Sequence, residues 1–201
     1  AGGIFGGSLY FFTENTALGI TQASNVSFII CTAPLLTTIL SLLFYKSEKA
    51  SKGLIYGSLL ALMGVGLIVF NGSFVLKISP IGDWLTLLAA LSWAFYSLII
   101  KKMAGRYPTV FITRKIFFYG VLTILPAFLL HPLQPDAAVL LQPGVLFNLL
   151  FLAVLASLIC YVLWNVVLKQ LGTVRASNYI YLNPLVTMIA SSLILDEKIT
   201  L

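Results

Sequence analysis

The sequence has little charge. Only 9% of its 201 residues are charged, and it contains one histidine and two cysteines, whereas 60% of the residues are hydrophobic and the mean hydropathy is +1.03. Soluble domains are about a quarter charged, so this composition excludes an ordinary soluble globular protein. Cys31 and Cys160 both lie inside long apolar runs, where they read as small apolar residues rather than as a disulfide pair or metal ligands. We therefore expect an integral membrane protein without a metal or other cofactor.

Long apolar runs account for most of the chain. A helix needs roughly 20 apolar residues to cross a hydrocarbon core of about 30 Å. Seven runs come close to or exceed this length: Ile4 to Ile20, Val26 to Tyr45, Gly53 to Phe70, Trp84 to Ile100, Val110 to Leu130, Val145 to Leu168 and Ala176 to Leu195. The sequence thus predicts an all-α, polytopic helical bundle in the lipid bilayer, with seven spans and no soluble domain.

The positive charges are distributed unevenly between the connections. Ten of the twelve Lys and Arg residues lie in or beside residues 46–52, 101–115 and 169–175, which fall on one side of the predicted spans. By the positive-inside rule these three connections are cytoplasmic, and a bacterial inner (plasma) membrane is the expected location. Because this topology accounts for the net charge of +6, no nucleic-acid partner is expected.

An internal repeat relates the two ends of the chain. A shift of 150 positions places "ENTALGITQASNVSFIICTAPLLTTILSLL" over "WNVVLKQLGTVRASNYIYLNPLVTMIASSL", so that Asn15 meets Asn165 and Pro34 meets Pro184. The matched segments are spans one and two against spans six and seven. Since these are five spans apart, an odd number, the second copy crosses the membrane in the opposite direction. Inverted repeats of this kind are typical of secondary transporters.

These segments resemble the EamA-like transporters of the drug/metabolite transporter superfamily. The resemblance covers nearly the whole chain and is carried best by "QASNVSFIICTAPLLTTILSLLFYKSEKASKGLIYGSLLALMGVGLIVF", "GDWLTLLAALSWAFYSLIIKKM" and "RASNYIYLNPLVTMIASSLILDEKI". It implies two inverted five-helix repeats, ten helices when intact, with residues 1–72 holding family helices 3–5 and residues 83–201 holding family helices 6–9. Two helices are then expected before Ala1 and one after Leu201. It also implies export of amino acids or related small metabolites by alternating access.

A glutamate inside the first span is the leading candidate for a functional residue. Glu14 lies about ten residues into that span, where an ionised side chain facing lipid would cost at least a few kcal/mol. It must therefore face a cavity, have a partner, or be protonated. Tyr10 and Glu14 share one helical stripe, and Asn15 adds polarity beside them. We interpret these three residues as part of a substrate site and Glu14 as a proton-coupling candidate; the structural alternative is a glutamate that only joins two helices.

The repeat and the aromatic residues extend this candidate site. Trp164 occupies the position equivalent to Glu14, next to Asn165, so the site would combine an acid with an aromatic ring. Such a cavity suits amino acids or cations with an apolar body. Trp93, Tyr96 and Asn183 complete the predicted substrate-binding set, although tryptophan and tyrosine are also common as packing or interfacial residues in membranes.

We interpret two further features of the sequence as mainly structural. Pro34 and Pro184 lie near the middle of their spans, where proline removes a backbone hydrogen bond and kinks the helix. The small-residue pattern of Gly53, Gly57 and Gly64 suits close helix packing, either within the bundle or in a homodimer.

Other classes fit less well. A seven-helix receptor or retinal protein does not explain the inverted repeat, and the last span has no lysine for a retinal Schiff base. A membrane enzyme would need paired acids, an activated nucleophile or a metal cluster, none of which the sequence offers. A non-transporting membrane scaffold remains an alternative, and Glu14 argues against it.

Overall fold

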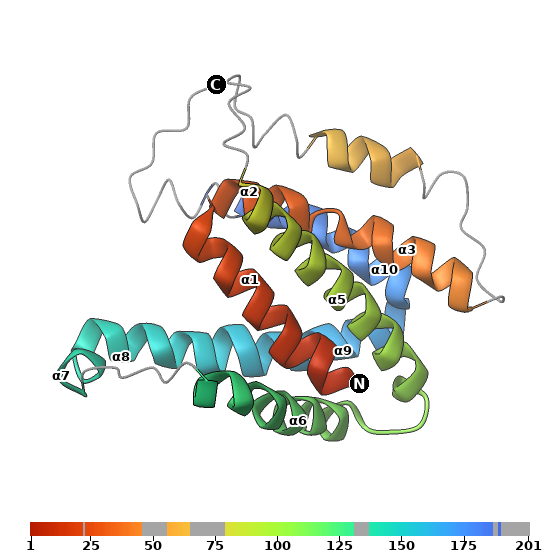
Figure 1. Cartoon of the computed structure of the whole chain (residues 1–201). Helices are drawn as coiled ribbons and strands as arrows, with labels where there is room; N and C mark the ends of the chain where they lie inside the picture. Colours follow the sequence, from red (N-terminus) through yellow and green to blue (C-terminus); the bar gives the residue numbers. More distant parts are fainter. Residues whose placement is uncertain (22, 46–55, 65–78, 131–136, 187–188, 190–201) are drawn as a thin grey trace.

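The computed structural model describes residues 1–21, 23–45, 56–64, 79–130, 137–186 and 189, and every regular element within these ranges is helical (Figure 1). The elements are the π-helical segments η1 (Ile4–Ser8) and η2 (Phe151–Ile159), the 3-10 segment η3 (Asn178–Leu182), and the α-helices α1 (Leu9–Ile20), α2 (Ala23–Ile30), α3 (Ala33–Phe44), α5 (Pro80–Ala104), α6 (Thr109–Leu130), α7 (Ala137–Leu140), α8 (Pro143–Leu150), α9 (Cys160–Leu171) and α10 (Thr173–Ser177). Residues 56–64 form a further helix.

Four stretches of helix are long and apolar enough to cross a membrane. They are Asn25–Phe44, Pro80–Ala104, Thr109–Pro126 and Pro143–Leu171. These coincide with predicted spans two, four, five and six, and span one, Ile4 to Ile20, is also helical as η1 and α1. Of predicted spans three and seven, only parts are described. Residues 46–52, Gly53 and the end of the last span lie outside the described residues.

Helix α5 lies at the centre of the bundle. It packs against α1, α2 and α3, and also against α9 and η1. Its sequence explains where it begins and ends: Pro80 stands in the first turn, Asp83 follows in that turn, and Lys101 and Lys102 occupy the last turn. Proline is favoured at the first helical position, and these charges complement the helix dipole. α5 therefore spans the bundle as one uninterrupted helix.

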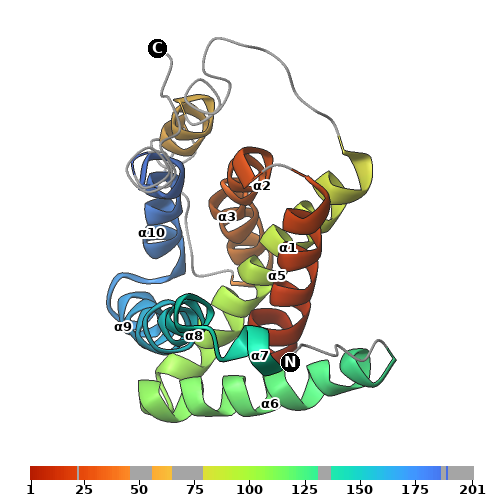
Figure 2. The same cartoon turned by 90° about the vertical axis from the view of Figure 1, so that its left-hand side faces the viewer.

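The long helix formed by α8, η2 and α9 crosses the bundle beside α5 and α6 (Figures 1 and 2). It begins with Pro143 in the first turn of α8 and ends at Leu171. Gly172 follows with φ of +79° and ψ of 163°, a combination that is essentially restricted to glycine. The chain then turns back into α10, which packs against α9 and α3. Because of this turn, α10 of the second predicted repeat lies against α3 of the first.

Both predicted proline kinks lie at changes in helical geometry. Two turn residues, Cys31 and Thr32, separate α2 from α3, and Pro34 stands in the first turn of α3. In the second copy the 3-10 segment η3 ends at Leu182, just before the helical residues that include Pro184. The irregular geometry therefore falls at matching positions of the repeat, immediately ahead of each proline.

Small residues allow η1 and α6 to come into close contact. A Cβ atom added to Gly3 would lie 2.6 Å from Cβ of Tyr119 and 2.9 Å from the backbone nitrogen of Gly120. A Cβ at Gly7 of η1 would lie 3.0 Å from Cα of Gly120 on α6, and a Cβ at Gly6 would overlap the ring of Tyr96 on α5. Close approach of backbones through small residues is the usual basis of helix association in membranes.

Candidate functional site

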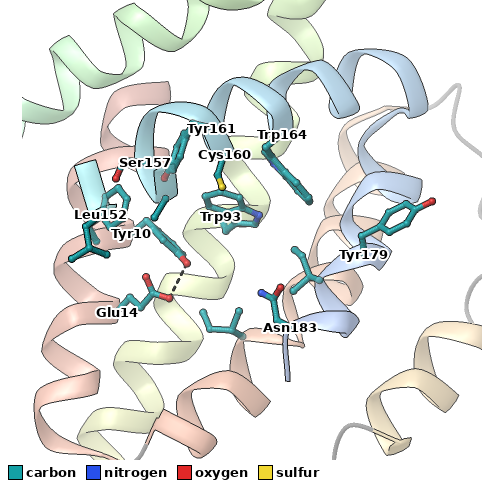
Figure 3. Close-up of a pocket in the computed structure, with 14 residues that line it drawn as sticks. Tyr10, Glu14, Trp93, Leu152, Ser157, Cys160, Tyr161, Trp164, Tyr179 and Asn183 are labelled. Atoms are coloured by element: carbon teal, nitrogen blue, oxygen red, sulfur yellow. Dashed lines mark hydrogen bonds between the residues drawn. The ribbon is translucent and has the colours of Figure 1, made fainter. Parts of the chain in front are cut away.

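A cavity of about 470 Å³ lies between the first span, α5, η2 with α9, and the segment from η3 to Asn183 (Figure 3). Its volume is within the range typical of small-molecule sites, roughly 300–1,000 Å³. The lining comprises Tyr10, Phe11, Glu14, Ile30, Trp93, Leu152, Ala156, Ser157, Cys160, Tyr161, Trp164, Tyr179, Ile180 and Asn183.

Among the lining residues that the structure describes, Glu14 is the only carboxylate, and there is no lysine or arginine. The Tyr10 hydroxyl donates a hydrogen bond to Oε1 of Glu14 over 2.8 Å. The two residues are one helical turn apart on α1, and Figure 3 shows both side chains directed into the same space. One donor, the Tyr10 hydroxyl, thus orients the carboxyl group, and the second oxygen has no hydrogen-bond partner among the described residues.

Aromatic rings form most of the wall opposite Glu14. The ring centroids of Trp93 lie 4.9 Å from Tyr10, 5.6 Å from Tyr161 and 5.7 Å from Trp164. The indole Nε1 atoms of Trp93 and Trp164 are both buried without a hydrogen-bond partner among the described residues. A buried donor without a partner is costly, so these two N–H groups are candidates for binding an acceptor on a substrate. The aromatic faces also suit an organic cation.

A buried hydrogen-bond network supports this wall from behind. Asn165 is 1% exposed; its Oδ1 accepts a bond from the Tyr96 hydroxyl over 2.7 Å, and its Nδ2 donates to Oγ1 of Thr113 over 2.9 Å. The network joins α5, α6 and α9. The ring centroid of Tyr96 lies 5.1 Å from that of Trp93, so Asn165 positions an aromatic ring that contacts the cavity wall.

The structure separates the predicted site residues into two groups. Tyr10, Glu14, Trp93, Trp164 and Asn183 all line the cavity. Asn15 is exposed and is not among the lining residues, and Tyr96 and Asn165 lie in the network behind the lining rather than in it. Asn15 does not line the cavity because consecutive residues of an α-helix point about 100° apart, and Glu14 points into the cavity.

Several lining residues were not predicted, although the repeat contained a signal for them. Four pairs of lining residues are separated by 150 positions, the offset of the sequence repeat: Tyr10 and Cys160, Phe11 and Tyr161, Glu14 and Trp164, Ile30 and Ile180. Applying the offset to the neighbours of Glu14 would have identified Cys160 and Tyr161. Leu152, Ala156 and Ser157 have no counterpart in the lining at this offset and follow only from the position of η2.

The described residues contain no group of three or more His, Cys, Asp or Glu side chains that could hold a metal ion. Both cysteines are free; Cys31 is buried and Cys160 is exposed at the cavity. The chemistry that this arrangement supports is non-covalent binding, with one acid, two indole donors and aromatic faces as the recognition groups.

Comparison with known proteins identifies the family of the chain. Residues 1–70 and 80–201 match the model of the EamA-like transporter family. An uncharacterized transporter of Archaeoglobus fulgidus is 30% identical over 195 residues, which cover 96% of this chain and 66% of that protein. A probable amino-acid metabolite efflux pump of Escherichia coli is 23% identical over 92% of this chain and 64% of its own length.

A solved crystal structure shares the fold, with a TM-score of 0.73 at 21% identity over 96% of this chain and 64% of that chain. The chain thus spans slightly less than two thirds of the length of these relatives. The relatives are named as transporters and not as enzymes. With a family match over nearly all of its residues, the chain belongs to the EamA-like transporter family.

Proposed function

We propose that the whole protein is a secondary transporter that exports small amino-acid-related metabolites by alternating access, with Glu14 as the proton-coupling group. The observation that carries the proposal is the Tyr10–Glu14 pair, which opens onto a cavity whose wall is formed by Trp93 and Trp164. A carboxyl group at this depth in a membrane span marks a substrate or proton pathway by default. The name of the Escherichia coli relative supports the substrate class.

The second support is that both halves of the chain contribute to the cavity. Four pairs of lining residues are separated by 150 positions, with one member of each pair in each of the two predicted repeats, 1–72 and 83–201. In transporters with inverted repeats, the substrate site lies between the repeats near the bilayer midplane. We propose the same arrangement here, with residues 46–52, 101–115 and 169–175 on the cytoplasmic side of a bacterial inner membrane.

The recognition groups suggest how a substrate is oriented. An ammonium group would lie between Glu14 and the aromatic faces, where charge attraction and cation–π contact both favour it. A carbonyl or carboxylate oxygen would accept from the indole N–H groups of Trp93 and Trp164. The proposal requires no covalent chemistry and no cofactor, only a small-molecule substrate and a proton.

Exchange transport tests this proposal. The full-length protein in proteoliposomes should exchange at least one member of a panel of labelled amino acids, amino-acid esters and organic amines, with saturation and competition. Trp93→Ala should abolish this exchange, whereas Trp84→Ala should preserve it, because Trp84 lies on the same helix but is 72% exposed and does not line the cavity. If the protein exchanges no member of the panel and binds none, the scaffold alternative is favoured.

A further inference from the structure

One hydrogen bond joins the two predicted repeats beside the cavity. The hydroxyl of Tyr161 donates to the backbone carbonyl of Gly6 over 2.6 Å. Tyr161 lies two residues after the π-helical segment η2 and is 5% exposed, and Gly6 lies inside the π-helical segment η1 and is buried. The bond therefore connects the first predicted span to the sixth, across 155 positions of sequence.

The two π-helical segments occupy equivalent places in the repeat. A shift of 150 positions moves η1, Ile4–Ser8, to residues 154–158, which lie within η2, Phe151–Ile159. π-Helical turns are rare and occur often at functional sites. Under the same shift Phe11 corresponds to Tyr161, and Gly6 corresponds to Ala156.

Phe11 and Tyr161 also touch each other. Their rings are stacked, with centroids 6.1 Å apart and an angle of 29° between the planes, and both rings line the cavity. Two residues related by a two-fold axis can be in contact only if both lie close to that axis. Phe11 and Tyr161 therefore lie close to the axis that relates the two predicted repeats, where the repeats would move against each other during alternating access.

Phe11 and Tyr161 differ in one group, because only the tyrosine has a hydroxyl. In a carrier with inverted repeats, one repeat rocks against the other around a fixed site. We take the alternate state as the one in which each repeat has the conformation that the other repeat has here. The contact equivalent to Tyr161–Gly6 would then be between residue 11 and the carbonyl of Ala156. Phenylalanine has no hydroxyl to donate, so the equivalent contact in the alternate state contains no hydrogen bond.

We infer that the Tyr161 hydroxyl biases the alternating-access equilibrium toward the conformation seen here, because its repeat equivalent Phe11 cannot form the matching bond in the alternate state. This inference rests on the proposed transport function. A neutral hydrogen bond is worth about two- to tenfold in such an equilibrium. Tyr161 is then a positioning residue for the transport cycle and does not itself need to contact the substrate.

Three variants test the inference without relying on loss of the bond alone. Tyr161→Phe removes the bond from the state seen here, and Phe11→Tyr adds the matching donor to the alternate state. Both should shift the equilibrium in the same direction, by about two- to tenfold. The double variant Phe11→Tyr/Tyr161→Phe transfers the donor from one repeat to the other and should shift the equilibrium by roughly the product of the two. Phe11 is only partly buried at the cavity, which leaves room for the added hydroxyl.

The protein provides its own reporter for this equilibrium. Cys160 is exposed at the cavity, whereas Cys31 is buried and can be replaced by alanine. In the full-length protein with any other cysteine removed, a membrane-impermeant maleimide is added to one side of the vesicle or the other. The ratio of the two labelling rates reports the equilibrium, and a change in the intrinsic reactivity of Cys160 next to Tyr161 cancels in this ratio.

The expected result is a ratio that shifts in one direction for both single variants and further for the double variant. An unchanged ratio, or opposite shifts for Tyr161→Phe and Phe11→Tyr, would overturn the inference while the proposed function stands. If Cys160 is labelled from one side only in every variant and substrate does not alter the rate, alternating access is contradicted, and the inference fails with it.

Discussion

Tyr10 and Glu14 lie one turn apart on α1, and the Tyr10 hydroxyl donates a hydrogen bond to Oε1 of Glu14 over 2.8 Å. A hydroxyl can donate to a carboxylate and equally to the carbonyl oxygen of a protonated carboxyl group. Glu14 can therefore gain or lose a proton without losing this partner. This property suits the coupling role that we propose for Glu14.

The indole donors give a prediction about substrate affinity. Trp93→Phe and Trp164→Phe keep an aromatic ring at the cavity but remove an N–H group that has no partner among the described residues. We expect each variant to raise the KM for a substrate that carries an acceptor group by about two- to tenfold. An amine without such an acceptor should be affected much less. Equal KM values for wild type and both variants across the panel would show that neither indole binds substrate through its N–H.

The network around Asn165 gives a prediction about stability. Asn165→Ala would leave the Tyr96 hydroxyl and the Thr113 hydroxyl without their buried partner. We expect the free energy of unfolding in detergent to fall by about 1–2 kcal/mol. The matched control is Asn15→Ala, since Asn15 is an exposed asparagine on α1. An Asn165→Ala protein as stable as this control would contradict the role of the network.

The contact between η1 and α6 gives a third prediction. Gly3→Ala would place a methyl group against the backbone of α6, 2.9 Å from the nitrogen of Gly120, and overpacking of this kind costs about 1–3 kcal/mol. Gly19, in α1, has no atom within 4 Å of its added Cβ, so Gly19→Ala should be neutral or slightly stabilising. Thermal unfolding of the two variants compares them directly. Equal transition temperatures would be inconsistent with the close helix contact.

The fold class could be predicted from the sequence because hydrophobic length is a strong signal. Spans one, two, four, five and six were located to within a few residues of the helices observed. The details of helical geometry were not predictable in this way. Nothing in the apolar composition of "IFGGS" or "FLAVLASLI" distinguishes a π-helical segment from an α-helix, because the register of backbone hydrogen bonds depends on packing against other helices.

The candidate site was predictable in part. Glu14 is identified by the cost of a charge in a membrane, and its helical stripe includes Tyr10, which lies beside it in the lining of the cavity. Asn165 is different: its polarity indicated a role, but only the fold shows that both ends of its amide are already bonded to other helices. Sequence polarity therefore cannot separate a residue that faces a cavity from one that supports it.

The most direct test of Glu14 as the coupling residue is proton-driven accumulation in proteoliposomes. A pH gradient is imposed on vesicles that contain the full-length wild-type protein, Glu14→Gln, or Asn15→Ala as the adjacent control, and accumulation and exchange of a transported substrate are both measured. We predict that Glu14→Gln retains exchange but loses gradient-driven accumulation, while Asn15→Ala behaves like wild type. Accumulation by Glu14→Gln equal to that of wild type would contradict the assignment of Glu14 as the coupling residue.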